Sequence, residues 1–197
     1  MPFAFPERIE TERLIIRPAR PGDGAEVNAA IRETYDDLHR WMEWADHVPE
    51  VAETEARQVW AHGRYLRGED YSAKAYRKDT GDLAVAIGLH VLDADPPAFE
   101  IGYWCRASCQ GKGYVTEAVR ALTRVAFDVL GARRVEIRCD ARNLRSRAVA
   151  ERAGYPLEAV LPADQTAPDG SVRDTCVYAL SRADPVEKSI ADGSSGT

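Results

Sequence analysis

Cysteines are few and widely spaced in this chain of 197 residues. There are four, and only Cys105 and Cys109 stand close enough to form half of a metal site. No second close pair follows them, and the four histidines lie upstream at positions that share no ligand spacing with the cysteines. We therefore expect reduced thiols in or near strands and no bound metal.

Long apolar runs are also missing, because charged residues interrupt every stretch before it reaches the roughly 18 residues of a membrane span. Residues 1–9 contain proline, glutamate and arginine where a signal peptide would have an apolar core. These two observations exclude the usual signals for insertion into or export across a membrane. A cytoplasmic protein without a membrane partner is the simplest expectation.

The chain has no excess of positive charge, since 26 Lys and Arg residues stand against 32 Asp and Glu residues, for a formal net charge of −6. Nucleic-acid phosphates require a basic surface, so a nucleic-acid partner is not expected. A cationic partner, such as an amine or a basic peptide, fits this balance better. The length suits one domain, which we place at residues 1–180, followed by a polar and flexible tail at 181–197.

Two kinds of hydrophobic periodicity follow one another along the chain. Strand-type patterns occupy residues 13–17, 71–77, 83–92, 99–105, 134–140, 155–161 and 172–180. The strand-helix-strand unit at 99–140 should pair in parallel through a right-handed crossover, while the other strands pair antiparallel. This order predicts an α/β (α+β) fold with a mixed, mostly antiparallel sheet of six to seven strands flanked by helices.

Helix-type spacing is clearest at residues 115–129, where apolar residues recur every three or four positions and Gly131 follows. A second clear helix covers 144–153 and stops at Gly154. Asp23 is a candidate N-cap for a helix that runs to about residue 33. Two further amphipathic segments are predicted at 35–44 and 53–66.

The loop before the 115–129 helix contains Gly111 and Gly113, which let backbone amides approach a ligand closely. The helix start adds free N–H groups and the positive end of a dipole, so the loop suits a pyrophosphate. A Walker loop is excluded because Gly113 follows Lys112 and Arg106 stands where a glycine is needed. A Rossmann loop is excluded because Thr116 replaces its third glycine. A glycine-rich turn that binds nothing remains equally compatible with the loop taken alone.

The flanking residues carry a family resemblance. Gln110-x-x-Gly113-x-Val115 resembles the acyl-CoA loop of GNAT N-acetyltransferases, with Val115 in place of the usual small residue. The runs Phe-Glu-Ile-Gly-Tyr-Trp-Cys at 99–105 and Cys-Asp-Ala-Arg-Asn-Leu-Arg-Ser at 139–146 resemble its RimJ/RimL branch. The opening at 10–18 and the run at 150–155, which ends at Tyr155, also resemble this branch. The resemblance spans roughly residues 9–180, and the branch includes enzymes for ribosomal-protein N-termini and enzymes for small amines.

The resemblance implies the GNAT fold, acetyl-CoA as co-substrate and an amine acceptor. It implies a set of cofactor contacts at Trp104, Cys105, Arg106, Gln110, Gly111, Lys112, Gly113, Tyr114, Val115, Thr116, Asn143 and Ser146. A lysine in solvent is an equal alternative for Lys112, and helix capping is an alternative for Asn143. A homodimer also fits the family.

Acyl transfer to an amine needs a base, because an ammonium must lose a proton before it attacks. The resemblance assigns that role to Glu100, although a surface glutamate or one paired with an arginine would look the same in sequence. It assigns Ser146 to protonate the leaving thiolate, with serine at a helix start as the alternative. A backbone N–H within residues 103–105 is expected to stabilise the developing oxyanion, and splaying of this strand from the next is expected to open a slot for pantetheine.

The segment at 35–44 is expected to cover the acceptor. The acceptor contacts predicted there are Tyr35, His39, Trp41 and Trp44, with burial in the core as the alternative. Three functions remain open at this point: acetylation of protein N-terminal amines, acetylation of a polyamine, amino sugar or drug, and acyl-CoA binding by a regulator without turnover.

Overall fold

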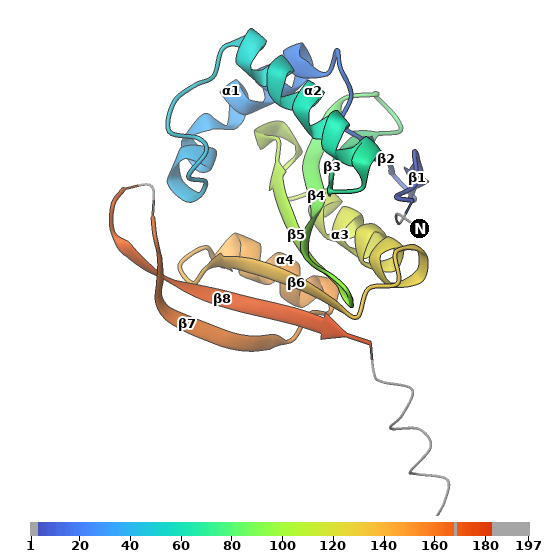
Figure 1. Cartoon of the computed structure of the whole chain (residues 1–197). Helices are drawn as coiled ribbons and strands as arrows, with labels where there is room; N and C mark the ends of the chain where they lie inside the picture. The colour runs from blue at the N-terminus through green and yellow to red at the C-terminus, as the bar shows by residue number, and fades with distance from the viewer. Residues whose placement is uncertain (1–3, 168, 183–197) are drawn as a thin grey trace, which may run out of the picture.

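The computed structural model describes residues 4–167 and 169–182 of the chain, and a single mixed sheet forms its centre (Figure 1). The strands of this eight-stranded sheet lie in the order β1-β2-β3-β4-β5-β6-β8-β7. Their bounds are β1 Ile9–Glu10, β2 Leu14–Pro18, β3 Asp70–Arg77, β4 Leu83–Ala94, β5 Pro97–Cys105, β6 Arg134–Asp140, β7 Leu157–Thr166 and β8 Val172–Ser181. The mixed, mostly antiparallel sheet is confirmed, and the additional strand is β1, which is too short to show an alternating pattern.

Helices flank the sheet, as predicted. They are α1 Gly24–Trp41, α2 Val51–Arg67, α3 Tyr114–Arg124 and α4 Leu144–Ala153, with short helical turns η1 Ala107–Cys109 and η2 Val125–Val129. Within the described ranges, no helix has both the length and the apolar character needed to cross a membrane. Since β8 ends at Ser181, nearly all of the expected tail lies outside the described residues.

The two helical segments predicted on either side of residue 34 are one helix, α1, and Trp44 lies beyond its end. Asp23 is the N-cap residue of this helix, as predicted, but its side chain makes no capping hydrogen bond. Its carboxylate instead accepts two hydrogen bonds from Arg17, at 2.7 and 2.8 Å, and one from the N–H of Arg20 at 2.9 Å. A charged bidentate partner is stronger than a backbone N–H, so the guanidinium takes the carboxylate.

The helix predicted at 115–129 changes type within its length. It is α-helical through Arg124 and continues as a π-helical turn, in which the N–H of Leu130 donates to the carbonyl of Val125 at 3.0 Å. The wider π turn rotates later side chains away from the apolar stripe. Val129, which the periodicity places on that stripe, is consequently 51% exposed.

The main core lies between the sheet and α3, and alternation along each strand decides which side chains enter it. In β3, Tyr71, Ala73 and Ala75 belong to this core, so Lys74 points to the opposite face. A second, smaller cluster there joins α1 to Tyr76 and Leu83. The opposite face is therefore where polar side chains from the central strands gather.

The parallel pair β5–β6 separates soon after it forms. Its register covers only Ala98 with Arg134, Phe99 with Val135, and Glu100 with Glu136. From residue 101 onward the strands diverge, and β6 continues to pair only with β8 (Figure 1). The splayed strands expected from the resemblance are thus present, and they open the sheet at its middle.

Candidate active site

A cavity of about 820 Å³ lies between the end of β5, the following loop and the N-termini of α3 and α4. Most of the residues predicted to contact the cofactor line it, namely Trp104, Cys105, Gln110, Gly111, Gly113, Tyr114, Val115, Thr116, Asn143 and Ser146. Arg106 and Lys112 do not line it. The Nε of Arg106 pairs with Glu33 at 2.5 Å, and the Nζ of Lys112 donates to the carbonyl of Ser108 at 2.8 Å.

The loop over this cavity is shaped by glycine and held by Arg13. Gly113 has a φ of +81°, a conformation that residues with a side chain rarely adopt, and it is the N-cap residue directly before α3. Arg13 donates to the carbonyl of Lys112 at 2.9 Å and to Glu117 of α3 at 2.7 Å. The first N–H groups of α3 have no partner within the helix, so the loop and helix form an anion site.

The side-chain hydroxyl of Thr116 indicates whether this cavity fits a pyrophosphate. Its Oγ1 is buried and has no hydrogen-bond partner among the described residues, yet the side chain lines the cavity in the first turn of α3. Buried hydroxyl groups normally have a partner. A phosphate oxygen at the helix start would supply one, so the residues fit the pyrophosphate of coenzyme A.

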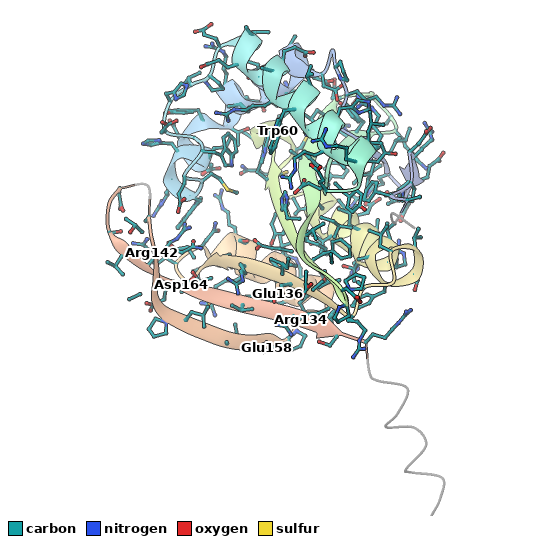
Figure 2. All side chains as sticks on the ribbon, viewed as in Figure 1. Trp60, Arg134, Glu136, Arg142, Glu158 and Asp164 are labelled. Carbon is teal, nitrogen blue, oxygen red and sulfur yellow. The ribbon has the colours of Figure 1, made fainter. Side chains whose placement is uncertain are left out.

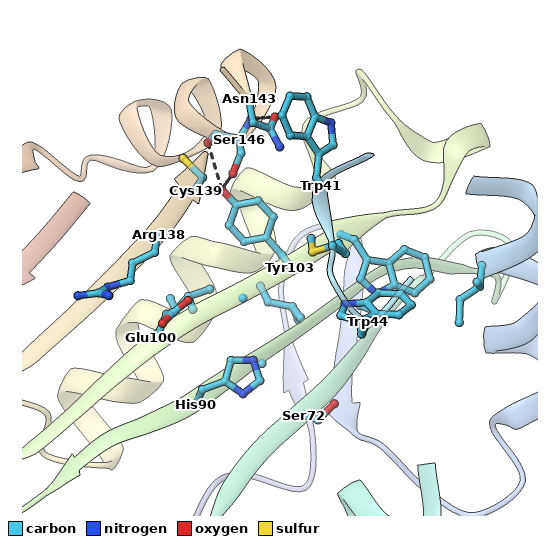
Figure 3. Close-up of a pocket in the computed structure, with 18 of the residues that line it drawn as sticks. Trp41, Trp44, Ser72, His90, Glu100, Tyr103, Arg138, Cys139, Asn143 and Ser146 are labelled. Carbon is cyan, nitrogen blue, oxygen red and sulfur yellow. Dashed lines mark hydrogen bonds between the residues drawn. The ribbon is translucent and has the colours of Figure 1, made fainter. Parts of the chain in front are cut away.

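A second cavity, of about 510 Å³, lies on the other face of the sheet. We name it the acceptor cavity, because Trp41 and Trp44, two of the predicted acceptor contacts, line it. It is lined by residues of α1, α2, β3 to β6 and β8, and it includes Glu100 and Trp44. Both cavities are lined by Trp41, Met42, Tyr103, Trp104, Asn143 and Ser146, which places their junction at the splay of β5 and β6 (Figure 3).

Tyr35 and His39 line neither cavity. The hydroxyl of Tyr35 donates to the carbonyl of Asp46 at 3.2 Å, and Nδ1 of His39 lies 2.8 Å from the carbonyl of Ala45. Both side chains therefore brace the turn after α1, which carries Trp44 into the acceptor cavity. Of the acceptor contacts predicted from sequence, only the two tryptophans are brought to the site.

Glu100 is half-buried in β5, directly opposite His90 of β4. Burial raises the pKa of its carboxyl, nearby His90 and Arg138 oppose that rise, and Glu136 adds to it. Within residues 4–167 and 169–182, this carboxyl makes no hydrogen bond or ion pair. The raised pKa and the cavity around it (Figure 3) are what a general base near neutral pH requires.

Arg138 is the arginine nearest in the sheet to Glu100, but it is engaged elsewhere. Its Nε donates to Glu136 at 3.0 Å, and the same carboxylate accepts from Nε of Arg134 at 2.9 Å. Arg134 also binds Glu158 of β7 at 2.6 and 2.8 Å, across β8 (Figure 2). This network ties Arg138 to the sheet and leaves Glu100 open to the cavity.

Tyr103 reaches across the gap to α4, a contact that the sequence interpretation missed. Its hydroxyl donates to the carbonyl of Ser146 at 3.1 Å and lies 3.0 Å from the Oγ of Ser146. Burial raises the pKa of Tyr103 above its ordinary value, and the bond to Ser146 partly opposes this, so the hydroxyl keeps its proton. Asn143 accepts the N–H of Ser146 at 3.1 Å, which confirms the capping alternative for its side-chain oxygen.

The cysteines carry no metal site in the described part of the chain, where no group of three metal-ligating side chains occurs. All four thiols are free. Burial raises the pKa of Cys105 to about 12 and that of Cys139 to about 11. Thiols that hold their protons this firmly act as small apolar side chains.

Sequence reasoning also missed the cations of the acceptor cavity. Arg57 stands on α2, and Lys74, Arg138 and Arg173 stand on β3, β6 and β8. The available signal was Lys74, which stands between two alanines in β3, although that strand also carries Asp70, Ser72 and Arg77. Its location in a cavity depends on helices that are distant in sequence.

Comparisons with known proteins agree with this geometry. The profile of the acetyltransferase (GNAT) domain matches residues 13–156. YdaF of Bacillus subtilis (strain 168), named for ribosomal N-acetyltransferase activity, is 32% identical over 169 residues, which cover 86% of this chain and 91% of YdaF. YjcK of the same organism, named for N-acetyltransferase activity, is 42% identical over 155 residues, which cover 77% and 85%.

A solved structure of RimL, a ribosomal L7/L12 α-N-protein acetyltransferase in complex with coenzyme A, has the same fold. Its TM-score is 0.83 at 23% identity, and the match covers 89% of this chain and 98% of RimL. The chain therefore belongs to the GNAT acetyltransferase family, and its activity is the transfer of an acetyl group from acetyl-CoA to an amine.

Proposed function

We propose that this enzyme acetylates the α-amine at the N-terminus of a cytoplasmic protein. YdaF is named for ribosomal N-acetyltransferase activity and RimL for α-N-protein acetyltransferase activity, which supports this proposal. The observation that carries the proposal is a pair of buried polar atoms on β8. Nε of Arg173 and Oγ1 of Thr175 line the acceptor cavity, and neither has a hydrogen-bond partner among the described residues.

These two atoms favour an extended peptide over a small amine. Arg173 and Thr175 are alternate residues of β8, so their side chains leave the strand on the same face. Leaving a buried polar group unpaired costs about 1–3 kcal/mol. A peptide backbone offers a carbonyl group at every residue to accept hydrogen bonds from both atoms, whereas a small amine has few groups with which to pair.

Three side chains at or next to the junction of the cavities, those of Glu100, Tyr103 and Ser146, have roles in the proposed reaction. The thioester of acetyl-CoA supplies the electrophilic carbonyl. Glu100 removes a proton from the ammonium group of the acceptor, directly or through one water, and the neutral amine then attacks that carbonyl. N–H groups of β5 that face the gap stabilise negative charge on the carbonyl oxygen, because divergence from β6 leaves them without a strand partner. Tyr103, together with Ser146, supplies a proton to the departing thiolate.

The experiment is an acceptor panel with the purified enzyme and acetyl-CoA. It compares peptides with a free N-terminus and one internal lysine, the same peptides with a blocked N-terminus, and a polyamine and an amino sugar. Release of coenzyme A gives the rate, and fragment mass spectrometry locates the acetyl group. We expect acetylation of free α-amines only, and a slower rate for Glu100→Gln.

The other outcomes contradict the proposal in different ways. Turnover with the polyamine or the amino sugar, but with none of the peptides, would show that the enzyme is a small-molecule acetyltransferase. Acetylation of blocked peptides would show that lysine side chains are the acceptor. Binding of acetyl-CoA without turnover on any amine would favour a regulator.

We also propose that residues 1–180 act as one catalytic domain, that 181–197 are dispensable, and that the enzyme works as a homodimer. The first two proposals predict full activity after truncation at residue 182. Light scattering measures the oligomeric state, and a monomer at the assay concentration would contradict the third.

A further inference from the structure

Lys74 is a buried cation in the wall of the acceptor cavity. The residue is only 4% exposed, and it lies in the middle of β3 on the face away from the main core. Its Nζ makes one hydrogen bond within the described ranges, to Oγ of Ser72 at 3.4 Å. Since an ammonium has three donors, two of them lack a partner among the described residues.

The nearest acidic side chain does not neutralise Lys74. Asp23 is close enough to affect it, but its carboxylate already binds Arg17 and the N–H of Arg20. Burial lowers the pKa of Lys74 to about 8, while Asp23 opposes that change and Arg17 adds to it. A buried ammonium without a bound counter-ion is unfavourable, so this position is prepared for an anion.

Gln58 places an unpaired acceptor in the same cavity. Its Oε1 is buried with no partner among the described residues, while its Nε2 donates to the carbonyl of Thr54 at 3.3 Å. Gln58 lines the cavity from α2, the helix that packs against β3. A ligand that carries both an N–H donor and an anion would satisfy Gln58 and Lys74 together.

The charge of the acceptor cavity has the opposite sign to that of the whole chain. The positively charged residues in its wall are Arg57, Lys74, Arg138 and Arg173, and the acidic ones are Glu100 and Asp140. Asp140 is paired with Arg142 at 2.7 Å, while Arg138 is paired with Glu136 at 3.0 Å and Arg173 with Glu43 at 3.4 Å. Among the described residues, Arg57 and Lys74 have no ion pair, so they outnumber the unpaired carboxyl of Glu100. The net charge of −6 favours a cationic partner when read from composition alone, but this cavity favours a ligand with a negative group.

We propose that the acceptor carries a carboxylate near its reacting amine, and that Lys74 binds this carboxylate while Gln58 accepts an N–H of the acceptor backbone. The inference rests on the proposed function and narrows it to protein N-termini with Asp or Glu among their first residues. A free acidic amino acid has the same chemistry, and the test below separates the two sources.

The first test measures kcat/KM for peptides in which a single Asp is moved through the positions that follow the N-terminal residue. Each peptide has a partner with Asn at the same place. A hydrogen bond to a charged group is worth about 1.5–3 kcal/mol, so we expect the Asp peptide to be favoured about tenfold or more at one position. Free aspartate and asparagine form a separate arm.

Two lysine variants make the test specific. Lys74→Met keeps the length of the buried stem and removes the charge, so the fold should persist, which thermal unfolding checks. The ratio of Asp to Asn rates should fall toward one in Lys74→Met. Lys78→Met is the matched control, because Lys78 binds the carbonyl of Thr11 and Glu10 outside the cavity. An Asp preference that survives in Lys74→Met, or a wild-type ratio near one, would overturn the inference.

Calorimetric titration of the same peptides and of free aspartate into the enzyme loaded with coenzyme A separates this inference from the proposed function. Equal affinities of the wild type for the Asp and Asn ligands would contradict the inference even if peptides are acetylated. If no peptide is acetylated but aspartate binds in a manner that depends on Lys74, the carboxylate site stands and the protein acceptor does not.

Discussion

The hydroxyl of Tyr103 lies 3.0 Å from the Oγ of Ser146, and both residues line both cavities of the enzyme. Tyr103 belongs to β5 and Ser146 to the first turn of α4, 43 residues later. They meet because β5 and β6 diverge and leave a gap that the tyrosine spans. Two hydroxyl groups thus stand at the junction of the two cavities.

Tyr103→Phe should lower kcat on the order of 100-fold, since general acid catalysis typically contributes that much or more. Affinity for acetyl-CoA should change far less, because the ring and its packing remain. The measurement is steady-state kcat together with calorimetric binding of acetyl-CoA. Tyr155→Phe is the control: its buried hydroxyl contacts Thr123 at 2.6 Å away from both cavities, so it should lose stability and keep kcat. An unchanged kcat in Tyr103→Phe would remove the tyrosine from the mechanism.

Glu100→Gln should lower kcat/KM, and the pH profile of the wild type should show why. The raised pKa of Glu100 means that its base form is lost as pH falls through a value above that of an ordinary glutamate. The acidic limb of kcat/KM should therefore lie above the ordinary glutamate range and vanish in the variant. The free energy of unfolding near neutral pH should not fall, because the substitution removes a carboxylate that burial disfavours. A limb that persists in Glu100→Gln would assign it to another group.

Thr116→Val should weaken acetyl-CoA binding without destabilising the unliganded enzyme. The hydroxyl has no hydrogen-bond partner among the described residues, so the substitution breaks no bond between them. It does remove a hydrogen bond to phosphate, which is worth about 0.5–1.5 kcal/mol. We expect a rise in Kd of up to about tenfold by calorimetry. Thr123→Val, about two turns further along α3, is the control. It should lower stability and leave the affinity for acetyl-CoA unchanged, because its hydroxyl binds the carbonyl of Val119 and the hydroxyl of Tyr155. Equal affinity in Thr116→Val would place the pyrophosphate elsewhere.

The pair of His90 and Asp70 should make stability depend on pH. Nδ1 of His90 lies 2.8 Å from Oδ2 of Asp70, and this bond raises the pKa of His90 despite its partial burial. Stabilisation from the pair is fully present below the ordinary histidine pKa of about 6.5 and is lost as pH rises through the raised value.

Urea unfolding at a series of pH values checks this dependence. His90→Gln should flatten the decline in the free energy of unfolding above about pH 6.5. His62→Gln is the matched control, since His62 binds the carbonyl of Ala19 and no carboxylate. A decline that is the same in wild type and His90→Gln would show that another group causes it.

Local patterns predicted the centre of the fold closely. The bounds of β6 and α4 were predicted to the residue, and the parallel pairing of the unit at 99–140 is confirmed. These features depend on neighbours in sequence: alternation, helical spacing, and glycine after a helix. Where distant groups compete, local signals fail, as when Arg17 takes the carboxylate of Asp23 from the helix start.

By itself, the sequence identified the glycine loop before α3 and Glu100 on the preceding strand, because each lies within a short contiguous run of residues. Only the tertiary structure decided that β5 and β6 separate, that Tyr103 meets Ser146 there, and that Lys74 lies buried in the acceptor cavity. These features arise from strands and helices far apart in the chain. Burial and charge at a site depend on everything packed around it, which no local pattern contains.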